Sequence, residues 1–174
     1  MNTLIAITAL GVICLIFELL NLRKILVPFS IVALCGILYL NSLDYNQTAS
    51  YYNNMIVVDN FSVTFTALFI VLTTFLVALG HHFYDDVPEK LSDFVAIKIF
   101  LLSGAAAMVS FGNLAMFFLG IEVLSISLYI LAASRRLNIK SNESGMKYFL
   151  MGSFASGIIL FGICLIYGAI GSFD

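Results

Sequence analysis

The chain has 174 residues, of which 61% are hydrophobic and only 10% are charged, and its mean hydropathy is +1.07. Soluble domains carry about 25% charged residues, so this composition excludes a sizeable soluble domain and indicates a polytopic membrane protein. Leucine, isoleucine and phenylalanine dominate, and ten-residue segments of alternating polarity do not occur. A transmembrane barrel is therefore excluded, and the expected fold class is all-α, a transmembrane helical bundle.

Six membrane-spanning helices are predicted from apolar runs that can cross a hydrocarbon core about 30 Å thick. They cover Leu4–Asn21, Ile25–Leu40, Phe61–Gly80, Asp93–Phe111, Leu114–Ala133 and Met146–Gly168. The polar segment Asn41–Asn60 is expected to be an exposed connection. The short turn Phe111–Asn113 makes the fourth and fifth helices antiparallel neighbours. The chain is expected to divide into residues 1–92, with three N-terminal helices, and residues 93–174, with the other three.

The basic residues predict the orientation of the bundle in the membrane. With six alternating helices, seven of the eight lysines and arginines fall on one side, and the connections on the other side contain none. The seven are Arg23, Lys24, Lys90, Arg135, Arg136, Lys140 and Lys147. Because cytoplasmic connections carry the excess of basic residues, both ends of the chain are expected on the outer side.

Glu122 is the polar residue that most needs an explanation. It lies near the middle of the apolar segment Leu114–Ala133, and an acidic side chain at that depth costs about 2.5–3.5 kcal/mol on insertion scales. Ser125 and Tyr129 follow at positions i+3 and i+7, on the same helix face. Two interpretations stand: a neutral carboxyl that is hydrogen-bonded within the bundle, or a proton-carrying or ion-pairing site. A relay also needs a second ionisable group, and no other one in the chain is expected at comparable depth.

Lys98 and Glu18 are the other charged residues inside predicted helices. Lys98 lies about one turn inside the fourth helix, so its ammonium can snorkel to the basic side; alternatively, it extends a path toward Glu122. Glu18 lies near Arg23 and Lys24, and an interfacial salt bridge is the simpler interpretation.

Metal and disulfide chemistry receive little support. The three cysteines each fall in a different apolar run and lack the spacing of a ligand pair, so they are interpreted as small buried hydrophobes: Cys14, Cys35 and Cys164. One group of possible metal ligands lies in a connection without a scaffold to set its geometry: His81, His82, Asp85 and Asp86. In the last helix, small residues such as Gly152 and Ser156 predict close helix packing.

Three segments carry a specific resemblance to a known family. Residues 113–132 read NLAMFFLGIEVLSISLYILA, residues 143–162 read ESGMKYFLMGSFASGIILFG, and residues 166–171 read IYGAIG. The first segment resembles the fifth helix, and the other two resemble the sixth helix and its closing motif, in the antiporter-like subunit N of bacterial NADH-quinone oxidoreductase, or respiratory complex I. The preceding residues fit that family only in helix count and general character.

The resemblance implies a function for Glu122. In that family the matching glutamate pairs with a lysine on a later, broken helix, and the charge state of the pair couples proton transfer to quinone reduction elsewhere in the complex. Glu122 would then be a proton-translocation residue in an enzyme subunit without a redox centre of its own. The chain would bind no cofactor, and the parent complex would use NADH and quinone. The expected partners are other membrane-arm subunits and the lipid bilayer, not nucleic acid, and the expected location is the bacterial inner (plasma) membrane.

The chain also departs from the family pattern. Family members have about fourteen helices with two inverted repeats, whereas six are predicted here, and the partner lysine is absent. We therefore expect an N-terminal portion of a longer polypeptide, or a truncated gene product. Two other functions stay open: a subunit of a multi-subunit cation/proton antiporter, which shares the fold, and a non-transporting structural membrane subunit.

Overall fold

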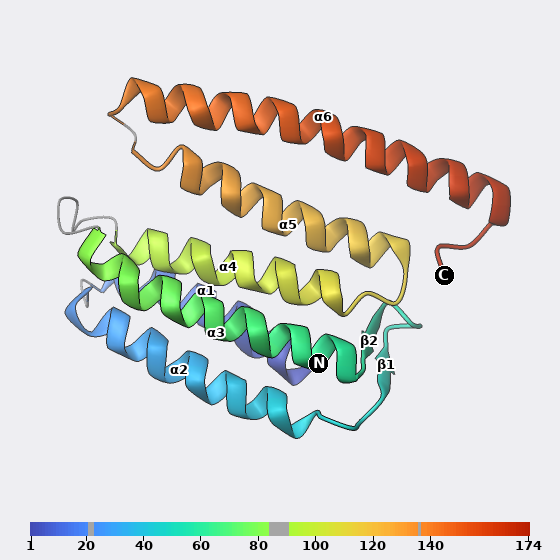
Figure 1. Ribbon diagram of the computed structural model, residues 1–174, viewed down its shortest axis with the longest axis horizontal. Coiled ribbons are helices and arrows are strands. Elements are labelled where there is room, and N and C mark those ends of the chain that lie inside the picture. The colour runs from blue at the N-terminus through green and yellow to red at the C-terminus, as the bar shows by residue number, and fades with distance from the viewer. Residues whose placement is uncertain (21–22, 84–90, 136) are drawn as a thin grey trace.

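The computed structural model describes residues 1–20, 23–83, 91–135 and 137–174. Within these residues the chain forms six helices and one small antiparallel hairpin (Figure 1). In chain order they are α1 (Asn2–Leu19), α2 (Arg23–Leu43), β1 (Ala49–Tyr51), β2 (Ile56–Val58), α3 (Asn60–Phe83), α4 (Leu91–Val109), α5 (Leu114–Ala132) and α6 (Ile139–Ile170). The predicted all-α fold with six helices is confirmed.

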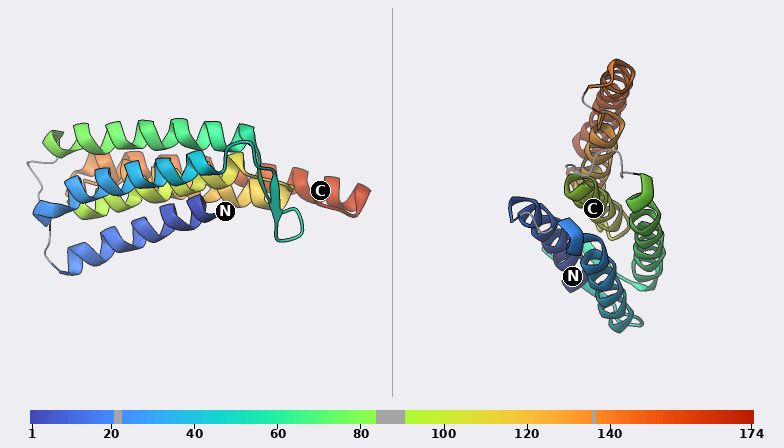
Figure 2. Two further views of the ribbon diagram at one scale, coloured as in Figure 1. Left: turned by 90° about the horizontal axis from the view of Figure 1, so that it is seen from below. Right: turned by 90° about the vertical axis from the view of Figure 1, so that its left-hand side faces the viewer.

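The hydrophobic core lies among the first four helices, with α4 at its centre. Ile99 and Leu102 of α4 are fully buried against Ile7 of α1, Leu34 of α2 and Ile70 of α3. Helices α5 and α6 extend from this core as two further layers, so that α4, α5 and α6 follow one another across the molecule (Figures 1 and 2). Most of the α6 surface is exposed, and its buried residues are Gly145 and Ile163.

Five of the helices in the described ranges are long and apolar enough to cross a membrane: α2, α3, α4, α5 and α6. Helix α1 provides a shorter apolar stretch, Asn2–Phe17, which spans about 24 Å at 1.5 Å per residue. Many large apolar side chains on these helices are exposed, as lipid-facing surfaces require.

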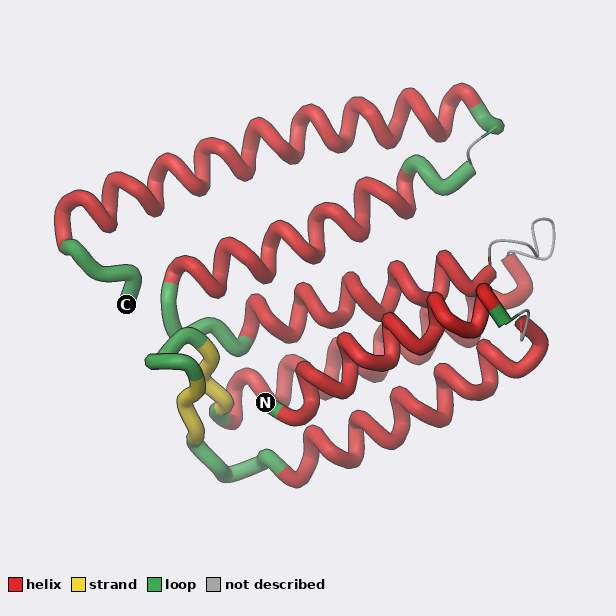
Figure 3. Tube along the Cα trace, turned by 180° about the vertical axis from the view of Figure 1, so that it is seen from behind, coloured by secondary structure: helices red, strands yellow, loops and turns green. Residues whose placement is uncertain are grey.

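The helix ends and connections lie at the two ends of the bundle as the predicted alternation of helix directions requires. Both termini and the hairpin lie at one end, and α2, α4 and α6 all begin at the other (Figure 3). Lys140 and Lys147 in the first turns of α6 lie at this second end, which we call the basic end. Glu143 pairs with Lys147 one turn further along the same helix.

The segment Asn41–Asn60 is largely exposed, as predicted, but part of it forms regular structure. It contains the hairpin, with Ala49 paired to Val58 and Tyr51 to Ile56, and both Ile56 and Val58 are buried. The backbone N–H of Val57 donates to the carbonyl of Ser110 at 2.9 Å, so the hairpin extends onto the connection between α4 and α5. The hairpin itself was not predicted, because two strands of three residues are too short to show an alternating pattern.

Helix α6 begins seven residues earlier than the predicted Met146. Hydropathy marks only the apolar part of the helix, whereas its first two turns are polar. The Asn138 side chain caps them by accepting a hydrogen bond from the backbone N–H of Lys140 at 2.9 Å. The whole helix has 32 residues and is about 48 Å long, which exceeds a hydrocarbon core of about 30 Å.

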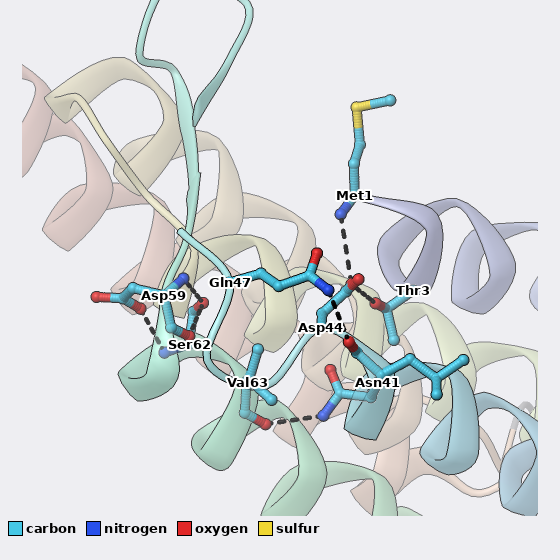
Figure 4. Close-up of polar contacts among 9 residues, drawn as sticks. Met1, Thr3, Asn41, Asp44, Gln47, Asp59, Ser62 and Val63 are labelled. Carbon is cyan, nitrogen blue, oxygen red and sulfur yellow. Dashed lines mark hydrogen bonds and ion pairs between the residues drawn. The ribbon is translucent and has the colours of Figure 1, made fainter. Parts of the chain in front are cut away.

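Polar contacts join α1, α2 and α3 at the end that carries the hairpin (Figure 4). The Thr3 hydroxyl donates to the Asp44 carboxylate at 3.2 Å, and the N-terminal amine lies 3.9 Å from the same carboxylate. The Asn41 side chain donates to the carbonyl of Val63 at 2.8 Å. These contacts set the relative heights of the first three helices, on which α4 and then α5 pack.

Candidate functional site

The candidate site is on α5, which is held against α4 by two glycines. A β-carbon on Gly104 would lie 2.5 Å from the backbone nitrogen of Leu124, and one on Gly120 would lie 2.6 Å from that of Met108. Contacts this close are possible only between helices whose backbones nearly touch. At the start of α5, the Asn113 side chain accepts a hydrogen bond from the N–H of Met116 at 2.9 Å and caps the helix. The position and rotation of α5 are therefore set by α4.

Glu122 faces away from this contact. Two residues after Gly120, its side chain leaves the helix about 200° around the axis. The residue is partly buried, but its Oε1 atom is buried completely and has no hydrogen-bond partner among the residues that the structure describes. The arrangement thus brings a carboxyl oxygen out of solvent without supplying a donor for it.

The face of α5 that carries Glu122 is turned toward α6. Ala133, the residue that follows α5, contacts Gly145 of α6, where a β-carbon would lie 2.5 Å from that of Ala133. Further along, the Tyr129 hydroxyl rests on Gly152 so closely that a β-carbon there would overlap it. The Tyr129 ring also packs edge-on against Phe149, with ring centroids 5.8 Å apart. Tyr129 therefore lies between the two helices, and it is 9% exposed.

The predicted polar face is only partly assembled. Glu122 and Tyr129 are seven residues apart and lie on the same side of α5, and Ser125 between them is partly buried. The Ser127 hydroxyl, by contrast, donates to the carbonyl of Val123 within the helix at 2.9 Å. In the antiparallel register that Ala133 and Gly145 define, Ser156 of α6 lies level with Glu122.

Lys98 is not placed beside Glu122. Its ammonium donates a hydrogen bond to the carbonyl of Leu76 in α3 at 3.1 Å. Within α4, Lys98 lies about 120° around the axis from Gly104, which faces α5. The two candidate residues therefore point from different helices in different directions, and a role for Lys98 in a path to Glu122 stays a prediction.

A cleft opens between α4, α5 and α6 near the basic end. It has a volume of ≈ 580 Å³. Its lining includes the polar side chains of Asp93, Ser134 and Asn142, together with Tyr129, Phe149 and other apolar residues. Asp93 is exposed in the first turn of α4. Sequence reasoning did not select Asp93 as functional, because only the packing of three helices brings it opposite Tyr129.

Two earlier predictions lie outside what the structure describes. The side chains proposed for the interfacial salt bridge (Glu18, Arg23 and Lys24) and for the weak metal site (His81, His82, Asp85 and Asp86) are not among the described ones. Among the described residues, no group of three or more histidine, cysteine, aspartate or glutamate residues is placed to hold a metal ion.

Sequence comparison relates the chain to subunits of one respiratory enzyme. The family model described as NADH:quinone oxidoreductase/Mrp antiporter, TM, matches residues 112–174. NADH-quinone oxidoreductase subunit N of Flavobacterium johnsoniae is 72% identical over all 174 residues, and that of Cytophaga hutchinsonii is 42% identical over the same length. The chain spans 38% of the length of each of these curated relatives.

Solved structures show the same fold. A chain of respiratory complex I from Thermus thermophilus, with bound aureothin, superposes with a TM-score of 0.81 at 25% identity; the match covers 98% of this chain and 38% of that one. A chain of an archaeal membrane-bound sulfane sulfur reductase superposes with a TM-score of 0.72 at 23% identity, over 100% of this chain and 39% of that one. The predicted resemblance is confirmed: the chain belongs to the NADH-quinone oxidoreductase subunit N family, to whose N-terminal part it corresponds.

Proposed function

We propose that this chain acts as part of a membrane-arm subunit of a proton-translocating NADH-quinone oxidoreductase in the bacterial plasma membrane. Glu122 is the group that takes up and releases a proton, or holds a charge, as the complex turns over. The oxidation of NADH and the reduction of quinone take place on other subunits, which are also its partners. Both ends of this chain face the outer side of the membrane, in agreement with the basic residues at the opposite end.

The buried, unpartnered Oε1 atom of Glu122 carries the proposal. Leaving a buried acceptor without a donor costs about 1–3 kcal/mol, and more if the group is charged. A carboxyl that served only to hold α5 and α6 together would be expected to use that oxygen in a hydrogen bond. An oxygen kept free of fixed donors can instead accept a proton or face a mobile partner.

A nearby cation that arrives or leaves would change the proton affinity of this carboxyl, because an opposite charge within about 4–6 Å favours the ionised form. The family resemblance assigns the cation to a lysine on a later helix, outside these 174 residues. The protonation of Glu122 would then follow the position of that charge, and the two groups would titrate as a coupled pair.

The test is Glu122→Gln in the intact complex, with the shape of the side chain retained. We expect proton pumping coupled to quinone reduction to be strongly impaired, while NADH oxidation by an artificial electron acceptor persists. The matched control is Ser127→Ala, because the Ser127 hydroxyl donates to the carbonyl of Val123 within its own helix. Normal pumping and normal assembly in the Glu122→Gln complex would refute the proposal and leave a structural role for the chain.

A second function receives support from one finding. The family model that matches residues 112–174 covers Mrp antiporters as well as the oxidoreductase, so the same fold serves both. Deletion of the gene distinguishes the two functions. Loss of growth at high sodium concentration or high pH, with NADH-driven proton pumping unchanged, would assign the chain to a cation/proton antiporter.

A further inference from the structure

We infer that one buried water is a structural component of this subunit, bound where α2, α3 and α4 meet next to the hairpin. The site is a small cavity at the end of the bundle that carries the hairpin, and its volume is ≈ 20 Å³. Three elements supply polar walls: Asn41 comes from α2, Thr66 from α3, and Ser110 directly follows α4. The site is separate from Glu122 and independent of the proposed function.

The size and charge of the cavity select the ligand. About 10–15 Å³ of such volume is enough for one water molecule, so ≈ 20 Å³ accommodates one water and nothing much larger. The described residues that line the cavity include no acidic side chain, so a metal cation would lie there without a counter-charge. Burying an unpaired charge costs far more than burying a neutral molecule that forms hydrogen bonds. Water is therefore the ligand that fits.

Two hydroxyls in the cavity need a hydrogen-bond partner. Thr66 is 4% exposed and Ser110 is 9% exposed, and neither hydroxyl forms a hydrogen bond with another residue that the structure describes. Buried polar groups in proteins are nearly always hydrogen-bonded, either to protein or to ordered water. Because both hydroxyls line the same cavity, a single water there satisfies the two together.

Other buried hydroxyls of the same helices are satisfied without water. In α3, the Thr73 hydroxyl donates to the carbonyl of Phe69 at 2.8 Å, and in α4 the Ser103 hydroxyl donates to the carbonyl of Phe100 at 2.7 Å. A serine or threonine in a helix commonly forms this bond to the preceding turn. The two hydroxyls at the cavity do not use it, which leaves them available to a ligand.

Asn41 completes the set of partners. The residue is 2% exposed, and its side-chain nitrogen donates to the carbonyl of Val63 at 2.8 Å (Figure 4). This bond fixes the orientation of the amide group, so its oxygen is left as an acceptor. A water in the cavity can donate to that oxygen and form one hydrogen bond with each of the two hydroxyls. About three hydrogen bonds are typical of a buried water.

The hairpin shields the site. Ile56 and Val58 of β2 line the cavity with apolar side chains, and each is 9% exposed. The N–H of Val57 between them donates to the carbonyl of Ser110 at 2.9 Å, so the strand is fixed over a residue that supplies one of the hydroxyls. The bound water links α2, α3 and α4 through hydrogen bonds where their polar side chains do not bond to one another directly.

The test is a cryo-electron microscopy map of the intact complex in which ordered waters are visible elsewhere in the membrane arm. We expect one density peak about 2.5–3.0 Å from Thr66 Oγ1, Ser110 Oγ and Asn41 Oδ1. The double variant Thr66→Val/Ser110→Ala removes both hydroxyls, and the peak should be lost. The matched control is Thr64→Val, because the exposed Thr64 hydroxyl donates to the carbonyl of Asn60 within α3 at 2.7 Å. The control should retain the peak.

Three results would overturn the water site. The first is a wild-type cavity without density, in a map that shows waters at other buried sites. The second is a peak about 2.4 Å from six or more oxygen atoms, because that geometry belongs to a bound metal cation. The third is a peak that is unchanged in the double variant, because the two hydroxyls would then not hold it. The wild-type map decides between water and an empty or cation-filled cavity even where the double variant does not assemble.

Discussion

The contact between α4 and α5 can be tested by adding one methyl group. In Gly104→Ala, the new β-carbon would lie 2.5 Å from the backbone nitrogen of Leu124 and 3.0 Å from its α-carbon. Ordinary contact begins at 3.4 Å, so the helices must separate locally by about 0.9 Å. Because the obstacle is backbone, no side-chain rotation can relieve the overlap.

Overpacking of this kind typically costs about 1–3 kcal/mol. Replacing glycine by alanine within a helix contributes about 0.8–1.0 kcal/mol in the opposite direction. Gly157→Ala in α6 is a matched control, because a β-carbon there meets nothing within 4 Å. We therefore expect Gly104→Ala to be less stable than Gly157→Ala by about the full overpacking cost of 1–3 kcal/mol.

The assay is unfolding of the purified complex in mild detergent by titration with a denaturing detergent, with the midpoint followed by loss of the intact subunit. A Gly104→Ala protein as stable as the Gly157→Ala protein would refute the close backbone contact. Since this contact sets the rotation of α5, that result would also remove the basis for turning Glu122 toward α6.

Two further predictions concern the ends of the helix pair. Gly112→Ala would place a β-carbon on the carbonyl oxygen of Asn54 and 2.8 Å from a methyl group of Val57. We therefore expect the hairpin to detach, so that the Val57 amide exchanges its hydrogen faster in the intact complex. Unchanged exchange would contradict the hairpin contact. Asn113→Ala removes the cap of α5 and should destabilise the subunit by about 1 kcal/mol, whereas Asn113→Asp should retain most of the stability in the same unfolding assay. Equal losses in the two variants would show that the cap contributes nothing.

The long exposed surface of α6 bears on how the subunit is completed. Its outward side chains are apolar along most of the helix, for example Met151, Phe154 and Phe161. Glu122 lies beneath this helix, and α6 is thus both a wall of the cleft and the outermost element of the chain. Any partner that packs on α6 can alter the surroundings of Glu122 without touching α5.

Helix count, topology and the candidate carboxyl could be predicted from the amino-acid sequence because they depend on local properties. A run of apolar residues that crosses a bilayer must satisfy its own backbone hydrogen bonds, and a helix does so within the segment. The depth of Glu122 follows from its position in such a run, and the alternation of connections with and without basic residues follows from the helix count.

The hairpin strand and the polar start of α6 were not predicted, because neither is marked by the hydropathy of the sequence. The strand Ile56–Val58 pairs with Ala49–Tyr51 and is fixed further by the hydrogen bond from Val57 to the carbonyl of Ser110, which is distant in sequence. No local pattern in the sequence indicates that bond. The polar first turns of α6 carry no hydropathy signal, although Asn138 caps them.

The direction of each polar side chain likewise depends on helix packing. Lys98 reaches the carbonyl of Leu76 because α3 lies beside α4 at that height, and Glu122 faces α6 because the glycines of α4 and α5 leave only one rotation of α5 that avoids overlap. Sequence periodicity places a residue on a face of its helix. Which neighbour that face meets is settled by close contacts between backbones far apart in the chain, such as those of Gly104 with Leu124 and of Gly145 with Ala133.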